Sequence, residues 1–279
     1  MASPVKNSGA AAKEVEAVKR GKVLKWLVKF NFTDRHVTMR LLRLQKSGNY
    51  STIKKMIAAG LIGETRVNGC PVPVLHLKAA GLMAAQKLLA GTADETLTAP
   101  IHPSRINVAH VQHDLLVQRF LLQFSERYPG AAFLSEKQIQ ARNMTVGKGT
   151  TLTAPKVPDA IIYFSSGSDK SEKQAWALEV QETSEEHDFA ERKISQYAEA
   201  ISRRELYGLI YFSTTPSIVN RIEKIARGPV RRWWFNEDHK RWYPDDNEPS
   251  PVTRKHLDQL MVFVSQASLA SQYYQYCVR

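Results

Sequence analysis

Two short apolar segments of the chain each carry one carboxylate. Asp159 lies near the start of KVPDAIIYF, residues 156–164, and Glu179 lies near the end of AWALEVQ, residues 175–181. Both segments have the length and apolar content of buried strands, so we expect the two acids on adjoining strands. Buried carboxylates placed side by side repel and raise each other's pKa, which costs several kcal/mol unless a cation lies between them.

A divalent metal ion is the cation that best explains this pair. Mg²⁺ or Mn²⁺ takes oxygen ligands, polarises a scissile phosphate and lowers the pKa of a bound nucleophile. We therefore expect Asp159 and Glu179 to be the metal ligands of a phosphodiesterase site. In the alternative interpretation, Asp159 only accepts hydrogen bonds from neighbouring backbone N–H groups, as an acid at a strand edge often does.

The pattern of these residues resembles that of the PD-(D/E)XK nuclease superfamily. The PD at 158–159 matches one part of its motif, and EVQ at 179–181 matches the other, except that Gln181 stands where the family usually has lysine. Some members carry glutamine there or bring a lysine from the following helix, and Lys193 could supply it here. The resemblance implies a catalytic group of Asp159, Glu179, Gln181 and Lys193. Without that context, Gln181 would be a solvent-facing strand residue.

Alternating elements are predicted around the two acids. We expect a long helix over 106–130, whose inner face carries His113, Val117, Leu121 and Phe124. Strands are predicted at 131–141, 157–164, 175–181, 207–213 and 257–265, and further helices at 186–206 and 217–235. The apolar stripe of the helix at 186–206 is Phe189, Ile194, Tyr197, Ala198 and Ile201. Helix, three strands, helix, strand and helix is the order of an α/β domain with a mixed sheet.

Positive charge is concentrated in the first part of the chain. The net charge of the whole chain is +12, and residues 1–60 hold thirteen Lys or Arg against three acids, a surplus of ten. A field this concentrated attracts a polyanion. The charges alternate with apolar residues in amphipathic segments, which favours a nucleic-acid-binding domain over a solubility tail.

The same region has the element order of a winged helix-turn-helix. Helices are predicted over 12–30, from Thr33 or Asp34 to Gly48, and over 49–60, followed by two strands around Asn68-Gly69 and a short helix at 78–89. In a winged helix the third helix enters the major groove and the wing contacts the DNA backbone. We expect phosphate contacts from Arg40, Arg43, Lys46, Lys54, Lys55 and Arg66.

The predicted organisation is a flexible leader at 1–14, a winged-helix domain at 15–90, a linker at 91–105 and a nuclease-like domain at 106–279. The chain has no apolar run of eighteen residues, so no membrane insertion is expected. The cysteines, Cys70 and Cys277, lie far apart and form no disulfide framework. These features favour a reducing cytoplasm.

The order of the motifs along the chain resembles the replication-relaxation proteins, which include plasmid relaxases of the MOBC class. The features that carry this resemblance are the winged helix, HVQHDLLV, PDAII and LEVQETSEE followed by KISQY, over roughly residues 20–215. The resemblance implies that His113 belongs to the active site. It also implies a protein that binds a plasmid transfer origin, opens it, nicks one strand and works with a conjugative coupling protein, so its DNA partner is both double- and single-stranded.

Other interpretations stay open at this stage. Tyr273, Tyr274 and Tyr276 could supply a covalent nucleophile, although a cluster at a chain end more often packs or frays. The Arg- and Trp-rich segment at 227–244 could stack on single-stranded DNA or could be a capping helix. The chain could also be a non-catalytic origin-binding or replication-control protein, as Gln181 suggests, or a protein-interaction adaptor.

Overall fold

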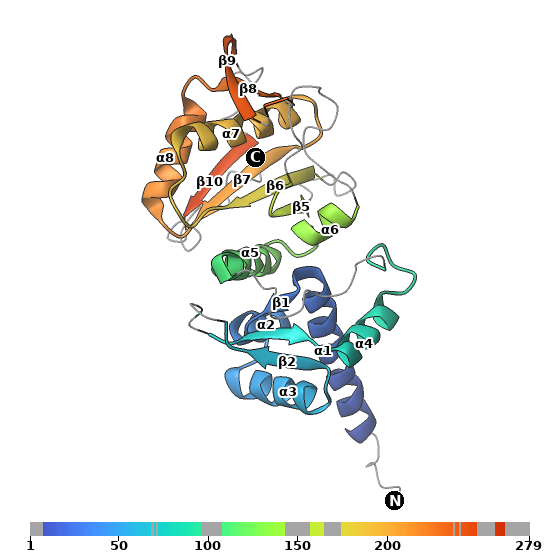
Figure 1. The fold of residues 1–279 in the computed structure, drawn as a ribbon. Helices are drawn as coiled ribbons and strands as arrows, with labels where there is room; N and C mark the ends of the chain where they lie inside the picture. Colours follow the sequence, from blue (N-terminus) through green and yellow to red (C-terminus); the bar gives the residue numbers. More distant parts are fainter. Residues whose placement is uncertain are drawn as a thin grey trace, which may run out of the picture. The chain divides into compact units, whose positions relative to one another are not determined.

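The structure is a computed structural model that describes residues 8–67, 70, 72–95, 108–142, 157–164, 174–236, 238–239, 241–249 and 260–265. The chain divides into two compact units, residues 1–123 and 124–279 (Figure 1). The predicted combination of helices with a mixed sheet is confirmed. Within the described residues, none of the helices is both long enough and apolar enough to span a bilayer.

The first unit packs helices around a small antiparallel sheet. In chain order its elements are α1 (Ser8–Phe30), β1 (Phe32–Thr33), α2 (Arg35–Leu42), α3 (Lys46–Ala58), β2 (Ile62–Thr65), β3 (Val74–Leu77), α4 (Ala79–Leu89) and most of α5 (Val108–Arg127). The sheet has the order β1-β3-β2. Its core joins α1, α3 and β3 through Val23, Leu27, Ile53, Met56 and Leu75, all fully buried.

The second predicted helix is shorter than expected. Asp34 is its N-cap, as predicted, and accepts a 2.6 Å hydrogen bond from the backbone of Val37. The helix ends at Leu42 rather than at Gly48, because Arg43 adopts a left-handed conformation with φ 51°. The next residue, Leu44, turns back against the core of the unit. Gly48 consequently lies inside α3, which starts at Lys46.

The predicted hairpin is present with a longer connection than a two-residue turn. Strands β2 and β3 pair antiparallel from Ile62↔Leu77 to Thr65↔Val74. Asn68-Gly69, on which the prediction rested, lie outside the described residues. Helix α3 ends before Gly60, whose φ of +68° suits a glycine stop, as expected.

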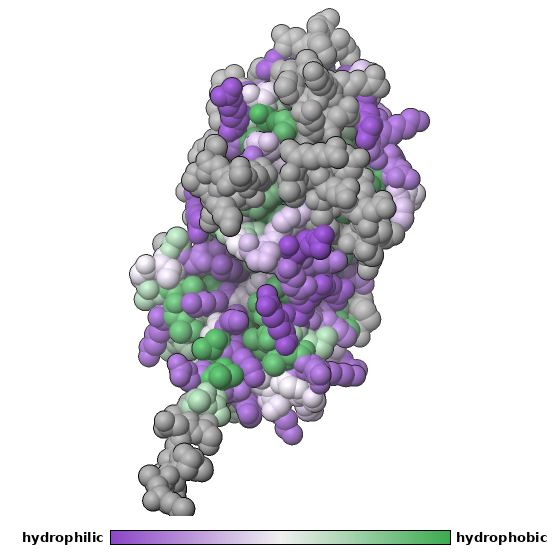
Figure 2. Space-filling view, turned by 180° about the vertical axis from the view of Figure 1, so that it is seen from behind, coloured by the Kyte–Doolittle hydropathy of each residue, from purple (hydrophilic) through white to green (hydrophobic). Residues whose placement is uncertain are grey.

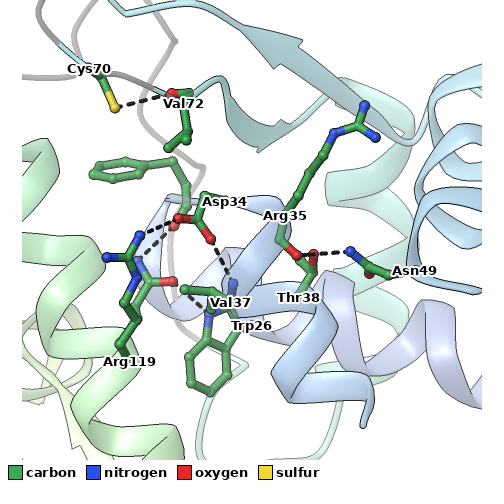
Figure 3. A network of polar contacts seen from close by, with 11 residues as sticks. Trp26, Asp34, Arg35, Val37, Thr38, Asn49, Cys70, Val72 and Arg119 are labelled. Carbon is green, nitrogen blue, oxygen red and sulfur yellow. Dashed lines mark hydrogen bonds and ion pairs between the residues drawn. The ribbon is translucent and has the colours of Figure 1, made fainter. Parts of the chain in front are cut away.

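Helix α5 is bonded to the first unit by two side chains. Arg119 forms an ion pair of 2.7 Å with Asp34 (Figure 3). Oε1 of Gln118 accepts a 2.8 Å hydrogen bond from the Trp26 indole, and its Nε2 donates to the carbonyl of Phe32 at 3.1 Å. The sequence placed this helix in the second domain, from residue 106. These long-range bonds explain why residues up to Gln123 group with the first unit instead.

The second unit is built on a five-stranded mixed sheet with the order β10-β7-β6-β5-β4. Strand β5 (Ala160–Phe164) pairs antiparallel with both of its neighbours, β4 (Ala132–Ser135) and β6 (Gln174–Val180). Helix α7 (His187–Ser202) then leads to β7 (Gly208–Ser213), which is parallel to β6. Helix α8 (Pro216–Arg227) comes next and is followed by a separate hairpin. The last strand, β10 (Met261–Ser265), is parallel to β7. Apolar residues of α7 and α8 pack on the sheet face that carries Ala177, Tyr211 and Phe263.

Three expectations for the second unit were wrong. The segment 131–141 is a strand only to Ser135, because Ser135 and Gln138 form a capping box that starts α6 (Glu136–Ala141). The predicted helix at 217–235 ends at Arg227, with Gly228 as its C-cap. The residues 231–236 form β8 (Arg231–Asn236), which pairs with β9 (Arg241–Pro249). Phe189 does not join the apolar stripe of α7, since it is 42% exposed.

Asp34 gives a direct test of how the first unit is held together. The carboxylate is fully buried, caps α2 and pairs with Arg119, so Asp34→Ala leaves the backbone N–H of Val37 and the Arg119 cation without this partner. We expect a loss of about 2–4 kcal/mol in the free energy of unfolding, measured by denaturant titration.

The matched control is Asp94→Ala, which removes the 3.1 Å pair with Lys29 and whose carboxylate is more exposed than that of Asp34. A pair of this kind contributes at most about 1 kcal/mol. Equal destabilisation by the two substitutions would contradict the role given to Asp34.

Candidate active site

The two acids predicted from the sequence lie at one end of neighbouring strands. Glu179 belongs to β6 and is 2% exposed, and Asp159 precedes β5 and is half-buried. The pairing of Ala160 with Leu178 places Asp159 opposite Glu179 in the antiparallel register. The Asp159 carboxylate accepts a 2.7 Å hydrogen bond from the backbone N–H of Val180. The backbone contact of the alternative interpretation is therefore present, in addition to the proximity of the two acids.

Glu179 points toward α7 and is held there by two side chains. The hydroxyl of Tyr197 donates a hydrogen bond to Oε1 of Glu179, and the ammonium of Lys193 lies 3.5 Å from Oε2. Lys193 and Tyr197 are four residues apart on α7, so they project from the same face of the helix. A buried carboxylate thus receives a hydrogen bond at one oxygen and a positive charge at the other.

Lys193 connects several groups of the site. Its ammonium lies 2.6 Å from Oε1 of Glu185 and 3.3 Å from Oε1 of Gln181. Burial lowers the pKa of Lys193, but the carboxylates of Glu179, Glu185 and Asp159 together outweigh burial and raise it above its usual value. Lys193 is consequently a permanent cation at neutral pH.

Gln181 lies inside the site and not on the surface. It is buried, its Oε1 accepts a 3.0 Å hydrogen bond from the hydroxyl of Tyr211, and its Nε2 donates to the carbonyl of Thr183 at 2.7 Å. Burial raises the pKa of Tyr211 and of Tyr197, and nearby carboxylates raise it further. Both tyrosines therefore stay neutral hydroxyl donors.

The donor atoms of Asp159 and Glu179 suit a hard divalent ion. Carboxylate oxygens are the ligands that Mg²⁺ and Mn²⁺ prefer, and a hydrogen bond such as that from Tyr197 orients a ligating carboxylate. A second cluster, made by His187, Asp188 and Glu191, has ligand atoms within 4.8 Å of one another. There Arg231 pairs with Glu191 at 2.6 Å and with Asp188 at 3.0 Å, as Lys193 pairs with Glu179 in the first cluster, so each cluster has a cation supplied by the protein.

A family model described as replication-relaxation matches residues 24–209 of the chain. The chain belongs to the replication-relaxation family. The match begins in α1 and ends at the start of β7, and it includes all five residues predicted to be catalytic, from His113 to Lys193. Membership indicates a role in replication or mobilisation. No curated protein and no solved structure matches the chain.

His113, which the resemblance to this family assigned to the active site, lies on the part of α5 that groups with the first unit. Its Nδ1 is 3.2 Å from Oδ1 of Asp114, and its side chain is 25% exposed. The neighbouring His110 is exposed. The catalytic role of His113 stays a prediction.

The six basic residues predicted to contact DNA are all exposed on the first unit. They are Arg40 on α2, Arg43 after it, Lys46, Lys54 and Lys55 on α3, and Arg66 after β2. In Figure 2 hydrophilic residues cover much of the visible surface of this unit, with apolar residues between them. Apolar side chains exposed on α1 and α4 include Val15, Val18 and Met83.

Sequence reasoning missed three members of the candidate site. Tyr197 was assigned to the apolar stripe of α7, although its position one turn after Lys193 was a usable signal. Tyr211 lies on β7 and reaches Gln181 only because β6 and β7 pair in parallel. Glu185 lies between β6 and α7, where no periodicity predicts the direction of a side chain.

Lys193→Met tests whether this ammonium stabilises the buried carboxylates. Removing it leaves Glu179 and Glu185 without their cation, so we expect a loss of about 2–4 kcal/mol in the free energy of unfolding at neutral pH. Because folding raises the pKa of Lys193, its contribution is complete below the unfolded pKa of about 10.4 and disappears as pH rises through the folded value. Denaturant titrations of both proteins at increasing pH measure this.

Lys224→Met, at an exposed position on α8, is the control and should leave stability nearly unchanged. A difference between wild type and Lys193→Met that stays constant through alkaline pH would contradict the electrostatic explanation.

Proposed function

We propose that this protein is a plasmid relaxase that binds a transfer origin and makes a metal-dependent nick in one strand. The observation that carries the proposal is the meeting of Asp159, Glu179 and Lys193 at one end of the second unit's sheet. Two carboxylates can hold a divalent ion, and a neighbouring lysine can stabilise the negative charge that develops when a phosphodiester is cleaved.

The topology of the second unit supports a PD-(D/E)XK nuclease fold. The antiparallel strands β4, β5 and β6 are followed by α7 and by the parallel strand β7, and the acids occupy β6 and the start of β5. Gln181 occupies the position where these nucleases usually have lysine. The ammonium of Lys193, on α7, lies 3.3 Å from Oε1 of Gln181. We propose that Lys193 takes the place of the lysine that these nucleases usually carry on the strand.

Each residue of the cluster has a distinct part in the proposed reaction. Asp159 and Glu179 would hold Mg²⁺ or Mn²⁺, which supplies charge neutralisation of the phosphate and a nucleophile of lowered pKa. Tyr197 orients the Glu179 carboxylate through its hydrogen bond. Lys193, a cation at neutral pH, stabilises negative charge that develops on the phosphate.

The first unit supports the proposed recognition of duplex DNA. Helices α2 and α3 followed by the β2–β3 hairpin have the order of a winged helix-turn-helix, in which the second of the two helices enters the major groove. Lys54 and Lys55 are exposed on α3, and Arg66 follows β2 at the base of the wing. We propose that these residues bind phosphates of the origin, and that a conjugative coupling protein receives the nicked strand in the bacterial cytoplasm.

One observation favours a second candidate function, a non-catalytic origin-binding or replication-control protein. Gln181 has no charge, and its amide is bonded to Tyr211, Lys193 and Thr183. The site could therefore hold the fold together without cutting DNA. The following experiment separates the two functions.

Conversion of supercoiled origin plasmid to open circles in the presence of Mn²⁺ tests the nicking activity. Asp159→Ala and Glu179→Ala should abolish open circles while leaving origin binding intact, because each removes a carboxylate that would hold the ion. Glu223→Ala removes an acid from a surface pair with Arg227 and should nick as wild type does. Intact plasmid with wild-type protein that still binds the origin would support the non-catalytic function.

The salt dependence of origin binding tests the proposed role of α3. Each phosphate contact contributes about one to the slope of log affinity against log salt, so replacing Lys54 and Lys55 by Ala should reduce the slope by about two. Replacing Lys22 and Lys25, exposed on α1, removes the same charge from the same unit. Equal slopes for the two double variants would place the DNA elsewhere.

A further inference from the structure

An aromatic side chain is exposed next to the catalytic cluster. Phe189 lies in the first turn of α7 and has 42% of its surface exposed, although the buried face of this helix packs on the sheet. Lys193 follows one turn later on the same helix, and its ammonium lies 5.2 Å from the centre of the Phe189 ring. The same ammonium is 3.5 Å from Glu179, so Phe189 is one side chain away from the acids.

A second aromatic ring is brought to this position by the β8–β9 hairpin. The guanidinium carbon of Arg192 lies 4.6 Å from the centre of the Phe189 ring and 5.1 Å from that of Trp242. Arg192 therefore lies against both rings, which come from elements far apart in the sequence. We call Phe189, Arg192 and Trp242 the aromatic cluster.

The hairpin that carries Trp242 is joined to α7 by ion pairs at the start of β8. Arg231, at the start of β8, forms two bonds to the carboxylate of Glu191, at 2.9 and 2.6 Å, and lies 3.0 Å from Asp188. Glu191 is almost fully buried, and it also accepts a hydrogen bond from the backbone N–H of Arg231 at 2.8 Å. A buried, fully bonded carboxylate of this kind makes the attachment of the hairpin specific.

The composition of the aromatic cluster suits one class of ligand. Unpaired bases stack on aromatic rings and on Arg guanidinium planes, while their phosphates are attracted by neighbouring cations. Bases within a duplex are stacked on one another and cannot make these contacts. An exposed ring with Arg192 and Lys193 beside it therefore matches single-stranded DNA, which carries bases and negative charge together.

We propose that the aromatic cluster is a stacking site for an unpaired base of single-stranded DNA. That this DNA is the strand opened at the nicking site rests on the proposed function. The proposal that a base stacks on the cluster does not. Lys193 contacts both Phe189 and Glu179, so a base stacked here is adjacent to the carboxylates. The cluster would hold the strand in register for the cut.

Binding of two fluorescent oligonucleotides, measured by anisotropy in EDTA, tests this proposal. One is oligothymidylate, and the other is an abasic strand of equal length and charge. The basic first unit attracts both strands alike, so their affinity ratio isolates stacking. We expect wild type to prefer oligothymidylate about five- to hundred-fold, and Phe189→Ala and Trp242→Ala to lose most of this preference without weakening abasic binding.

The control is Tyr207→Ala, which removes another exposed aromatic residue of the same unit. Tyr207 precedes β7 beside Trp176, at the opposite end of the sheet from Glu179, because β6 and β7 are parallel. It should keep the wild-type preference. A preference unchanged in both cluster variants, or absent in wild type, would overturn the proposal.

Failure of the proposed nicking function would leave a different result. A protein that does not nick the origin plasmid but prefers oligothymidylate through Phe189 retains the stacking site and loses the relaxase assignment. A protein that nicks at the wild-type rate in both cluster variants, with no base preference, retains the relaxase assignment and loses the stacking site.

Discussion

The buried ion pair between Lys193 and Glu179 is the interaction on which the site depends. Glu179 ends a strand in an apolar sheet, where an uncompensated carboxylate would take up a proton or unfold the strand end. Lys193 supplies the charge and Tyr197 the hydrogen bond, both from one face of α7. Glu179 can therefore stay ionised only while α7 is packed on the sheet with Lys193 and Tyr197 in place.

Charge is distributed differently in the two units. The first sixty residues carry a surplus of ten positive charges, and several acids of the second unit pair with nearby cations. Lys193 matches Glu179 and Glu185, and Arg231 matches Asp188 and Glu191. Long-range attraction for a polyanion would therefore act mainly at the first unit, while short-range ion pairs organise the candidate site of the second.

The sequence predicted these strands, and the position of the two acids on neighbouring strands, because a short apolar run that contains a single charged residue is a local signal. The resemblance to the nuclease superfamily led to Lys193 and Gln181, and the structure brings both side chains together. The sequence failed where tertiary contacts decide. Phe189, expected in the apolar stripe of α7, turns outward to meet Arg192. The capping box at Ser135 was a local signal that was overlooked.

The most direct measurement of the central claim is the anomalous difference density of a crystal soaked in manganese. A divalent ion held for catalysis predicts one peak within bonding distance of carboxylate oxygens of both Asp159 and Glu179, and its loss in Glu179→Gln. A peak only at His187, Asp188 and Glu191, or no peak at all with Lys193 still paired to Glu179, would contradict a metal-dependent nuclease.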